Sequence, residues 1–127
     1  MSRKIIIMCA AFTFLAVLSV VEQIAVGTIT GAALEQTREI MAKIRAGGFD
    51  TAAGQAQELD KTWDRQAKWL EIMVDHGSTD EVRYAFSRLL AALEQQDSAT
   101  AMVYACELEG AIEHVYERQA LTVENIF

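Results

Sequence analysis

Residues 60–81 have the sequence DKTWDRQAKWLEIMVDHGSTDE, and this stretch decides the fold. Its apolar side chains recur at steps of three and four residues, the spacing of one face of an α-helix, so another helix must cover them. Gly77 suits a left-handed cap after the last turn, and Ser78 and Glu81 have the spacing of a capping box. We therefore predict two helices that meet at a tight turn around Gly77. The apolar stripe consists of Leu59, Trp63, Ala67, Leu70 and Val74.

The composition favours a small all-α protein. The chain has 127 residues, 52% of them hydrophobic, and no proline, so the usual helix breaker is absent. All eighteen acidic residues follow Val21, whereas two of the eleven basic residues, Arg3 and Lys4, precede it, which leaves 9 − 18 = −9 as the net charge of the remainder. Such a surface repels nucleic acid, and we expect no nucleic-acid partner.

An uncharged apolar run, residues 5–21, follows the two N-terminal cations. A run of about 17 residues just reaches the length that crosses a bilayer and exceeds the core of a typical signal peptide. A signal peptide remains the alternative, because residues 25–27 offer a small-x-small cleavage site. An uncleaved anchor is favoured, since a helix can continue through Glu22 and Gln23 without a break.

This interpretation divides the chain into an N-terminal membrane anchor or signal segment, residues 1–21, and a helical hairpin domain, residues 22–127. With Arg3 and Lys4 held inside by the positive-inside rule, the hairpin domain lies outside the cytoplasm. We expect a single-pass protein of the cell membrane that contacts lipid through its N-terminal helix.

The helical domain is expected to be an antiparallel four-helix bundle made of two helical hairpins. Gly47 and Gly48 stop the first helical pattern, and Asp50 is placed to cap the next helix. The tail LTVENIF suits one further short turn that starts at Thr122. The expected helices cover residues 33–44, 50–76 and 79–95, and a fourth begins after Asp97 or Ser98.

The two hairpins have matching apolar positions when one is shifted by 49 residues. This shift places Ile40 on Leu89 before the turn and Trp63 on Ile112 after it. Tandem duplication explains the match. The alternative is that any two amphipathic hairpins of similar length align in this way.

A set of segments spread along the chain carries a recognisable pattern: the anchor, Trp63, Trp69-Leu70, Val74-Asp75-His76, Leu89, residues 113–115 and residues 121–126. This pattern resembles a family of short bacterial membrane proteins, domain of unknown function 4363. The resemblance covers nearly the whole chain and implies the anchored helical architecture. That family has no established activity, so the resemblance leaves the function open.

The two histidines, His76 and His114, are expected near the membrane-proximal end, because helices in the bundle alternate in direction. Asp75, Glu113 and Glu117 lie near them in the sequence. A divalent metal site with two histidines and a carboxylate, or a contact sensitive to pH, is one hypothesis. The favoured interpretation is structural: His76 meets the negative end of its helix dipole, and His114 lies on the surface. We therefore predict no metal and no cofactor.

The two tryptophans are expected to differ in role. Trp63 lies on the core stripe, whereas Trp69 lies on its flank and is the better candidate for contact with a partner, together with Tyr84 or Tyr116. The tail residue Asn125 belongs to the same expected surface. Partner-binding candidates are thus Trp69, His76, His114, Tyr116 and Asn125.

No nucleophile with a base partner, no phosphate-binding glycine loop and no basic stripe is present in the sequence. We therefore expect a non-enzymatic, membrane-anchored interaction or accessory subunit of a membrane or envelope complex. The alternative is a module that senses a ligand, a metal or pH through the end that carries His76 and His114.

Overall fold

The computed structural model describes the backbone of residues 2–73 and 76–126 and the side-chain environments of residues 2–72 and 76–119. The described chain is almost entirely helical and contains no strand, which confirms the all-α prediction. Its helices are α1 (Arg3–Arg45), α2 (Phe49–Met73), α3 (His76–Glu94) and α4 (Ser98–Ile126).

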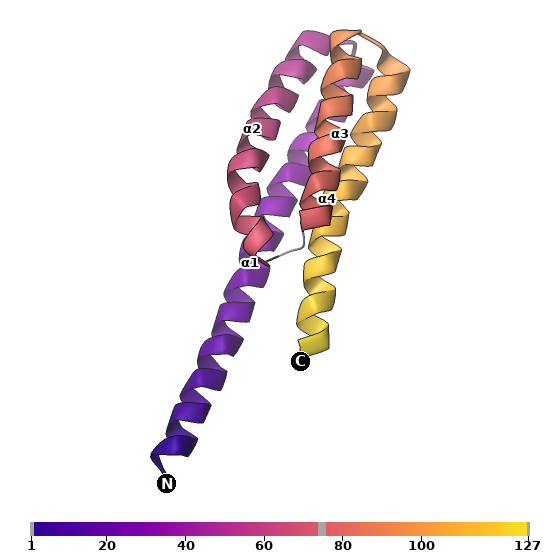
Figure 1. The fold of residues 1–127 in the computed structure, drawn as a ribbon. Coiled ribbons are helices and arrows are strands. Elements are labelled where there is room, and N and C mark those ends of the chain that lie inside the picture. Colours follow the sequence, from indigo (N-terminus) through magenta and orange to yellow (C-terminus); the bar gives the residue numbers. More distant parts are fainter. Residues whose placement is uncertain (1, 74–75, 127) are drawn as a thin grey trace.

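The four helices form an antiparallel bundle (Figure 1). Each helix packs against the next one along the chain, and α4 closes the ring by packing against α1. The turns after α1 and after α3 lie at one end, and the end of α2, the start of α3 and the end of α4 lie toward the other (Figure 1). Because the N-terminal end of α1, the expected anchor, extends beyond the latter, we call it the membrane-proximal end and the former the membrane-distal end.

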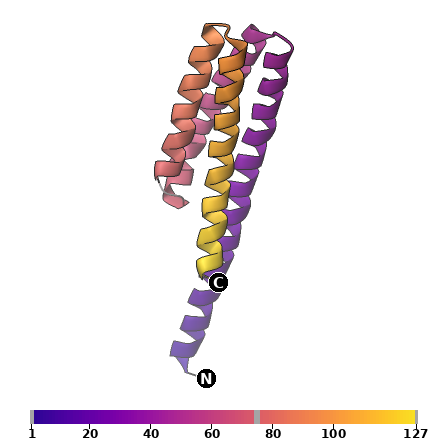
Figure 2. The same ribbon diagram turned by 90° about the vertical axis from the view of Figure 1, so that its right-hand side faces the viewer.

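α1 is a single unbroken helix with two environments. Its N-terminal end protrudes beyond the other helices (Figure 2), and no residue of its most apolar stretch is buried in the core. Val26 is the first of its buried residues, and burial then continues to Ile44. Among the described residues, this is one helix long and apolar enough to cross a membrane. The expected continuation through Glu22 and Gln23 is confirmed.

The bundle core contains the stripe that the sequence predicted. Leu59, Trp63, Ala67 and Leu70 of α2 are all buried, and Val74 lies outside the described residues. The other helices contribute side chains of the same kind at the expected spacing. The largest of these are Ile40, Ile44, Phe86, Leu89, Leu93, Leu108 and Ile112.

The turns at the membrane-distal end have the same hydrogen bonds. In the first, Gly47 has φ 79°, its amide donates to Ile44 O at 3.0 Å, and the Gly48 amide donates to Lys43 O at 2.9 Å. This is a Schellman motif, in which a left-handed residue ends the helix.

In the second turn, Gln96 has φ 55°, its amide donates to Leu93 O at 3.1 Å, and the Asp97 amide donates to Ala92 O at 3.2 Å. Each donor and acceptor lies 49 residues after its counterpart in the first turn. The shift found from apolar residues therefore also relates the backbone of the two turns, which favours two copies of one hairpin.

The predicted turn at Gly77 is wrong by a few residues. α2 ends at Met73 and α3 begins at His76, so Gly77 lies in the first turn of α3 and caps neither helix. Ser78 and Thr79 are buried inside α3, and the Thr79 hydroxyl donates to His76 O at 3.0 Å. Because these two side chains are part of the packed interior, α3 must start before them, and the expected capping box does not form.

Two other helix ends also differ from the prediction. α2 begins at Phe49, so Asp50 lies in the first turn, where its charge still meets the positive end of the helix dipole. α4 continues to Ile126 without the separate turn expected at Thr122.

The predicted cap of α4 is confirmed. Asp97 accepts a hydrogen bond from the Thr100 amide at 3.2 Å and another from the Thr100 hydroxyl at 2.7 Å. These bonds favour the carboxylate and lower the pKa of Asp97.

Candidate functional site

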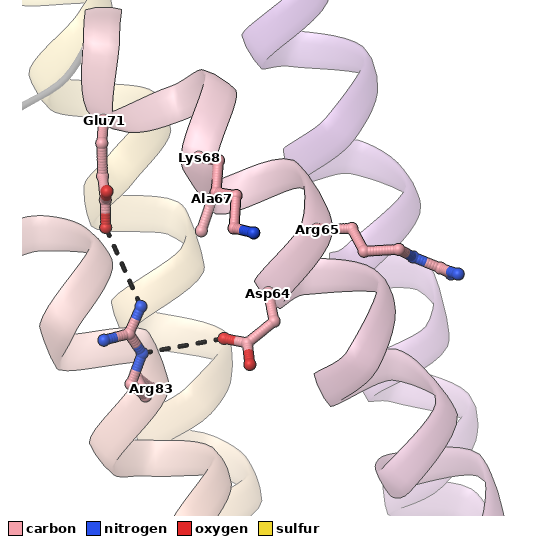
Figure 3. A pocket seen from close by; sticks show the side chains of 6 residues that line it. All are labelled: Asp64, Arg65, Ala67, Lys68, Glu71 and Arg83. Atoms are coloured by element: carbon pink, nitrogen blue, oxygen red, sulfur yellow. Dashed lines mark ion pairs between the residues drawn. The ribbon is translucent and has the colours of Figure 1, made fainter.

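The α2–α3 side of the membrane-proximal end carries an ion-pair cluster around Arg83. Its guanidinium lies 3.7 Å from an Asp64 oxygen, 3.8 Å from a Glu71 oxygen and 3.8 Å from an Asp80 oxygen. Figure 3 shows Arg83 of α3 between Asp64 and Glu71 of α2. Exposed pairs of this kind contribute roughly 1 kcal/mol or less each, so the cluster ties α2 to α3 weakly.

The ion-pair cluster lines a hollow with a volume of about 600 Å³, and Lys68 and Ala67 also line it. Arg65 lines it too, but its side chain extends away from Arg83 (Figure 3). Nearby Asp60 has its pKa raised because burial and the neighbouring Asp64 carboxylate disfavour its charge, although Arg83 opposes this effect. Since Arg83 already faces three carboxylates, its own charge is largely compensated and is not free for an anionic ligand.

His76 joins the edge of this cluster. Its Nδ1 lies 3.7 Å from a Glu71 oxygen, and its side chain is largely exposed. The contact is an ion pair only when the imidazole is protonated. Asp75, the carboxylate expected beside it, lies outside the described residues.

His114 lies in a different place, in a groove between α3 and α4 that we call the α3–α4 groove. Its volume is about 300 Å³, and small residues line it along α4. Arg88 and Glu107 pair across it at 3.8 Å. The groove is lined by Glu81, Tyr84, Ala85, Arg88, Glu107, Gly110, Ala111 and His114.

Tyr116 belongs to a third surface, between α4 and α1. A Cβ atom on Gly27 would lie 3.5 Å from Cε2 of Tyr116, so the tyrosine ring lies over that glycine of α1. The ring therefore packs on α1, although Tyr116 also remains 44% exposed. The side chain of Asn125 lies outside the described residues.

Trp69 is exposed, as predicted, and lies on a fourth surface, the outer side of α2. It is 66% exposed and Ile72, one turn later, is 80% exposed, whereas Trp63 is 1% exposed. Ile72 was not among the candidates predicted from the sequence. The sequence feature that could have identified Ile72 is its position one turn after Trp69, off the core stripe.

The candidates therefore do not form one common site. His76 pairs toward α2, while His114 faces the α3–α4 groove. In the described part of the chain, no group of three or more His, Cys, Asp and Glu side chains is arranged to hold a metal ion. The structure instead brings Tyr84 of α3 and His114 of α4 together in the lining of the α3–α4 groove.

The sequence places this architecture in a known family. Residues 21–126 match the family model described as Domain of unknown function (DUF4363), so the chain belongs to that family. No curated protein and no solved structure matches the chain.

Proposed function

We propose that this member of the family is a non-enzymatic interaction or accessory subunit of a membrane or envelope complex. Residues 5–21 of α1 cross the bilayer, and the four-helix bundle lies outside the cytoplasm. The observation that carries the proposal is the change of environment along α1, which passes without a break from a wholly exposed apolar half to a half packed in the core.

The exposed half of α1 has the composition that favours insertion. Ten of its residues between 5 and 21 are Ile, Leu, Val or Phe. Each contributes about −0.3 to −0.6 kcal/mol to insertion at the centre of a membrane helix, so together they contribute several kcal/mol. In water the same side chains would present an apolar surface far larger than a monomeric protein tolerates.

The α3–α4 groove is the surface on which we place the protein partner. Tyr84 is 61% exposed at its rim, and tyrosine is enriched among residues that dominate binding energy. Gly110 has no heavy atom within 4 Å of the position of a Cβ, so the groove is open above α4. A partner helix or extended segment with apolar side chains fits such a groove, and His114 and Glu81 supply polar contacts at its edge.

The alternative is a sensing module, and the pair between His76 and Glu71 favours it. Protonation of the imidazole would convert a polar contact into an ion pair beside the Arg83 cluster. Titration of the purified protein with Zn²⁺ in a calorimeter distinguishes the two functions. Heat that is lost in a His76→Ala variant would support sensing over protein interaction.

The groove is tested by Gly110→Leu, which fills it with an apolar side chain. We expect the free energy of unfolding to stay the same or rise by up to about 1 kcal/mol, because leucine is the better helix former. Partner binding should weaken at least tenfold. Gly54→Leu is the matched control, since Gly54 is an exposed helical glycine of α2 whose Cβ position is also open.

The partner is captured with a photoreactive phenylalanine at Tyr84, and the same group at exposed Glu58 of α2 serves as the control. We expect one defined membrane protein to crosslink at Tyr84 and to be lost with Gly110→Leu but retained with Gly54→Leu. Equal crosslinking from both positions, or capture that survives Gly110→Leu, contradicts a partner in the α3–α4 groove.

A further inference from the structure

Trp69 and Ile72 form an exposed apolar pair on the last turns of α2, which we call the α2 apolar pair. They are 66% and 80% exposed, the highest values among the large apolar side chains that the structure describes after Ile24. Neither contributes to the core, which Trp63 and Leu70 fill on the opposite side of the helix. Packing within the chain therefore does not explain them.

The register of α1 against α2 gives the height of this pair. The Gln55 side chain hydrogen-bonds to both Lys43 and Glu39, so Gln55 lies opposite the middle of that span, at Met41. The helices are antiparallel and rise equally per residue. Seventeen residues after Gln55 comes Ile72, and seventeen residues before Met41 comes Ile24.

By the same register, Trp69 is level with Gly27. The apolar run of α1 ends at Val21, so at 1.5 Å per residue Ile72 lies about 4.5 Å above the end of the run and Trp69 about 9 Å above it. The headgroup zone of a bilayer is roughly 5 to 8 Å deep on each side. A tilt of about 20° toward α2 lowers that helix by about 3 Å, because packed helices lie about 8 to 10 Å apart.

We propose that the α2 apolar pair binds the headgroup zone of the same membrane that α1 crosses, so that the bundle leans on the lipid surface along α2. The proposal rests on the membrane anchoring proposed above. The apolar surface is continuous in height, because Ile24 of α1 is also exposed at the level of Ile72. Tryptophan is the side chain most characteristic of this zone, where its ring is apolar and its N–H finds polar partners.

The lipid contact depends on apolar and interfacial affinity rather than on charge. The part of the chain beyond residue 21 has a net charge of −9, from 9 − 18, so anionic headgroups would be repelled. A membrane of zwitterionic phosphatidylcholine is therefore sufficient for binding. This composition also serves as the probe in the test below.

The test uses the full chain with Trp63→Phe, which leaves Trp69 as the only tryptophan. Phe keeps an apolar ring in the core, and Nε1 of Trp63 is buried without a hydrogen-bond partner, so no bond is lost. The protein is reconstituted in phosphatidylcholine vesicles that contain lipid with a nitroxide on either the headgroup or the distal acyl chain. The control carries Trp63→Phe, Trp69→Phe and Tyr84→Trp, because Tyr84 has similar exposure and lies farther from the anchor.

We expect the headgroup nitroxide to quench Trp69 fluorescence at least twofold more than it quenches the control, and more than the acyl-chain nitroxide does. Acrylamide should quench Trp69 at least twofold less than the control. Equal acrylamide quenching of the two proteins overturns the proposal. Shielding of Trp69 from acrylamide without lipid quenching also overturns it, because a second copy or another protein then covers the pair.

Two further measurements keep the result decisive. If Trp63→Phe does not fold, the difference in fluorescence between the native chain and Trp69→Phe gives the same signal, since buried Trp63 is insensitive to both quenchers. Flotation with the vesicles reports anchoring separately. A chain that does not float contradicts the proposed anchoring. A chain that floats but whose Trp69 is not quenched by the labelled lipid contradicts only the binding of the α2 apolar pair to the headgroup zone.

Discussion

Trp63 and Trp69 lie six residues apart on α2 in opposite environments. Trp63 is 1% exposed in the core, and Trp69 is 66% exposed on the outer surface. Six residues correspond to about 1.7 turns, so the two indoles point to different sides of the helix. One therefore stabilises the bundle, and the other is free to bind lipid or protein.

Trp63→Ala should lower the free energy of unfolding by about 3 to 5 kcal/mol, because it leaves a large cavity that the surrounding helices fill only in part. Trp69→Ala should cost less than about 1 kcal/mol, as expected for a surface substitution. Urea unfolding of the full chain in mild detergent, followed by circular dichroism, measures both. Equal losses of stability would contradict the separation into a core and a surface tryptophan.

At the scale of elements, the two membrane-distal turns perform the same task with different residues. Gly47 and Gln96 occupy equivalent left-handed positions, with φ of 79° and 55°. The left-handed conformation costs an L-residue roughly 1 to 2 kcal/mol, and glycine avoids this cost. The second turn is therefore strained where the first is not.

Gln96→Gly should raise the free energy of unfolding by up to about 1 kcal/mol, since part of the relieved strain is offset by the greater freedom of glycine in the unfolded chain. Gly47→Ala should lower it by a similar amount. Gly54→Ala, inside α2, is a control of opposite sign to Gly47→Ala, because alanine is favoured in a helix. A loss of stability in Gln96→Gly, measured by thermal unfolding, would contradict the strain at this turn.

Local pattern predicted the elements well and their ends less well. The stripe through Trp63 identifies a helix face from spacing alone, and Asp97 is recognisable as a cap. The Gly77 turn was placed late because Ser and Thr suit both a cap and the first buried positions of a helix, and only packing decides between them. Sequence also cannot show which faces adjoin, so the α3–α4 groove, which joins Tyr84 to His114, emerges only from the order of helices around the bundle.

At the scale of the whole molecule, α1 joins two regions that need different surroundings. The small-x-small site at residues 25–27 would, if cleaved, remove Val26 from the core and Gly27 from beneath the Tyr116 ring. The family match also begins at residue 21, before this site. The fold therefore favours retention of α1, because cleavage would remove part of the packed bundle.

In the proposed anchoring, α1 determines the orientation of the bundle. Arg3 and Lys4 precede the apolar run and the net charge beyond residue 21 is negative, so the N-terminus should remain in the cytoplasm. Two reporters are fused after Phe127, one an enzyme that is active only outside the cytoplasm and one that is active only inside. The activity of the first should then exceed that of the second at least tenfold. Replacing both cations, as Arg3→Glu and Lys4→Glu, should reduce this ratio, whereas Arg45→Glu and Lys43→Glu at the far end of α1 should not, because they lie beyond the segment that sets orientation. Activity of the cytoplasmic reporter in the native chain would reverse the topology, and a mature N-terminus at Thr28 would identify the apolar segment as a cleaved signal peptide.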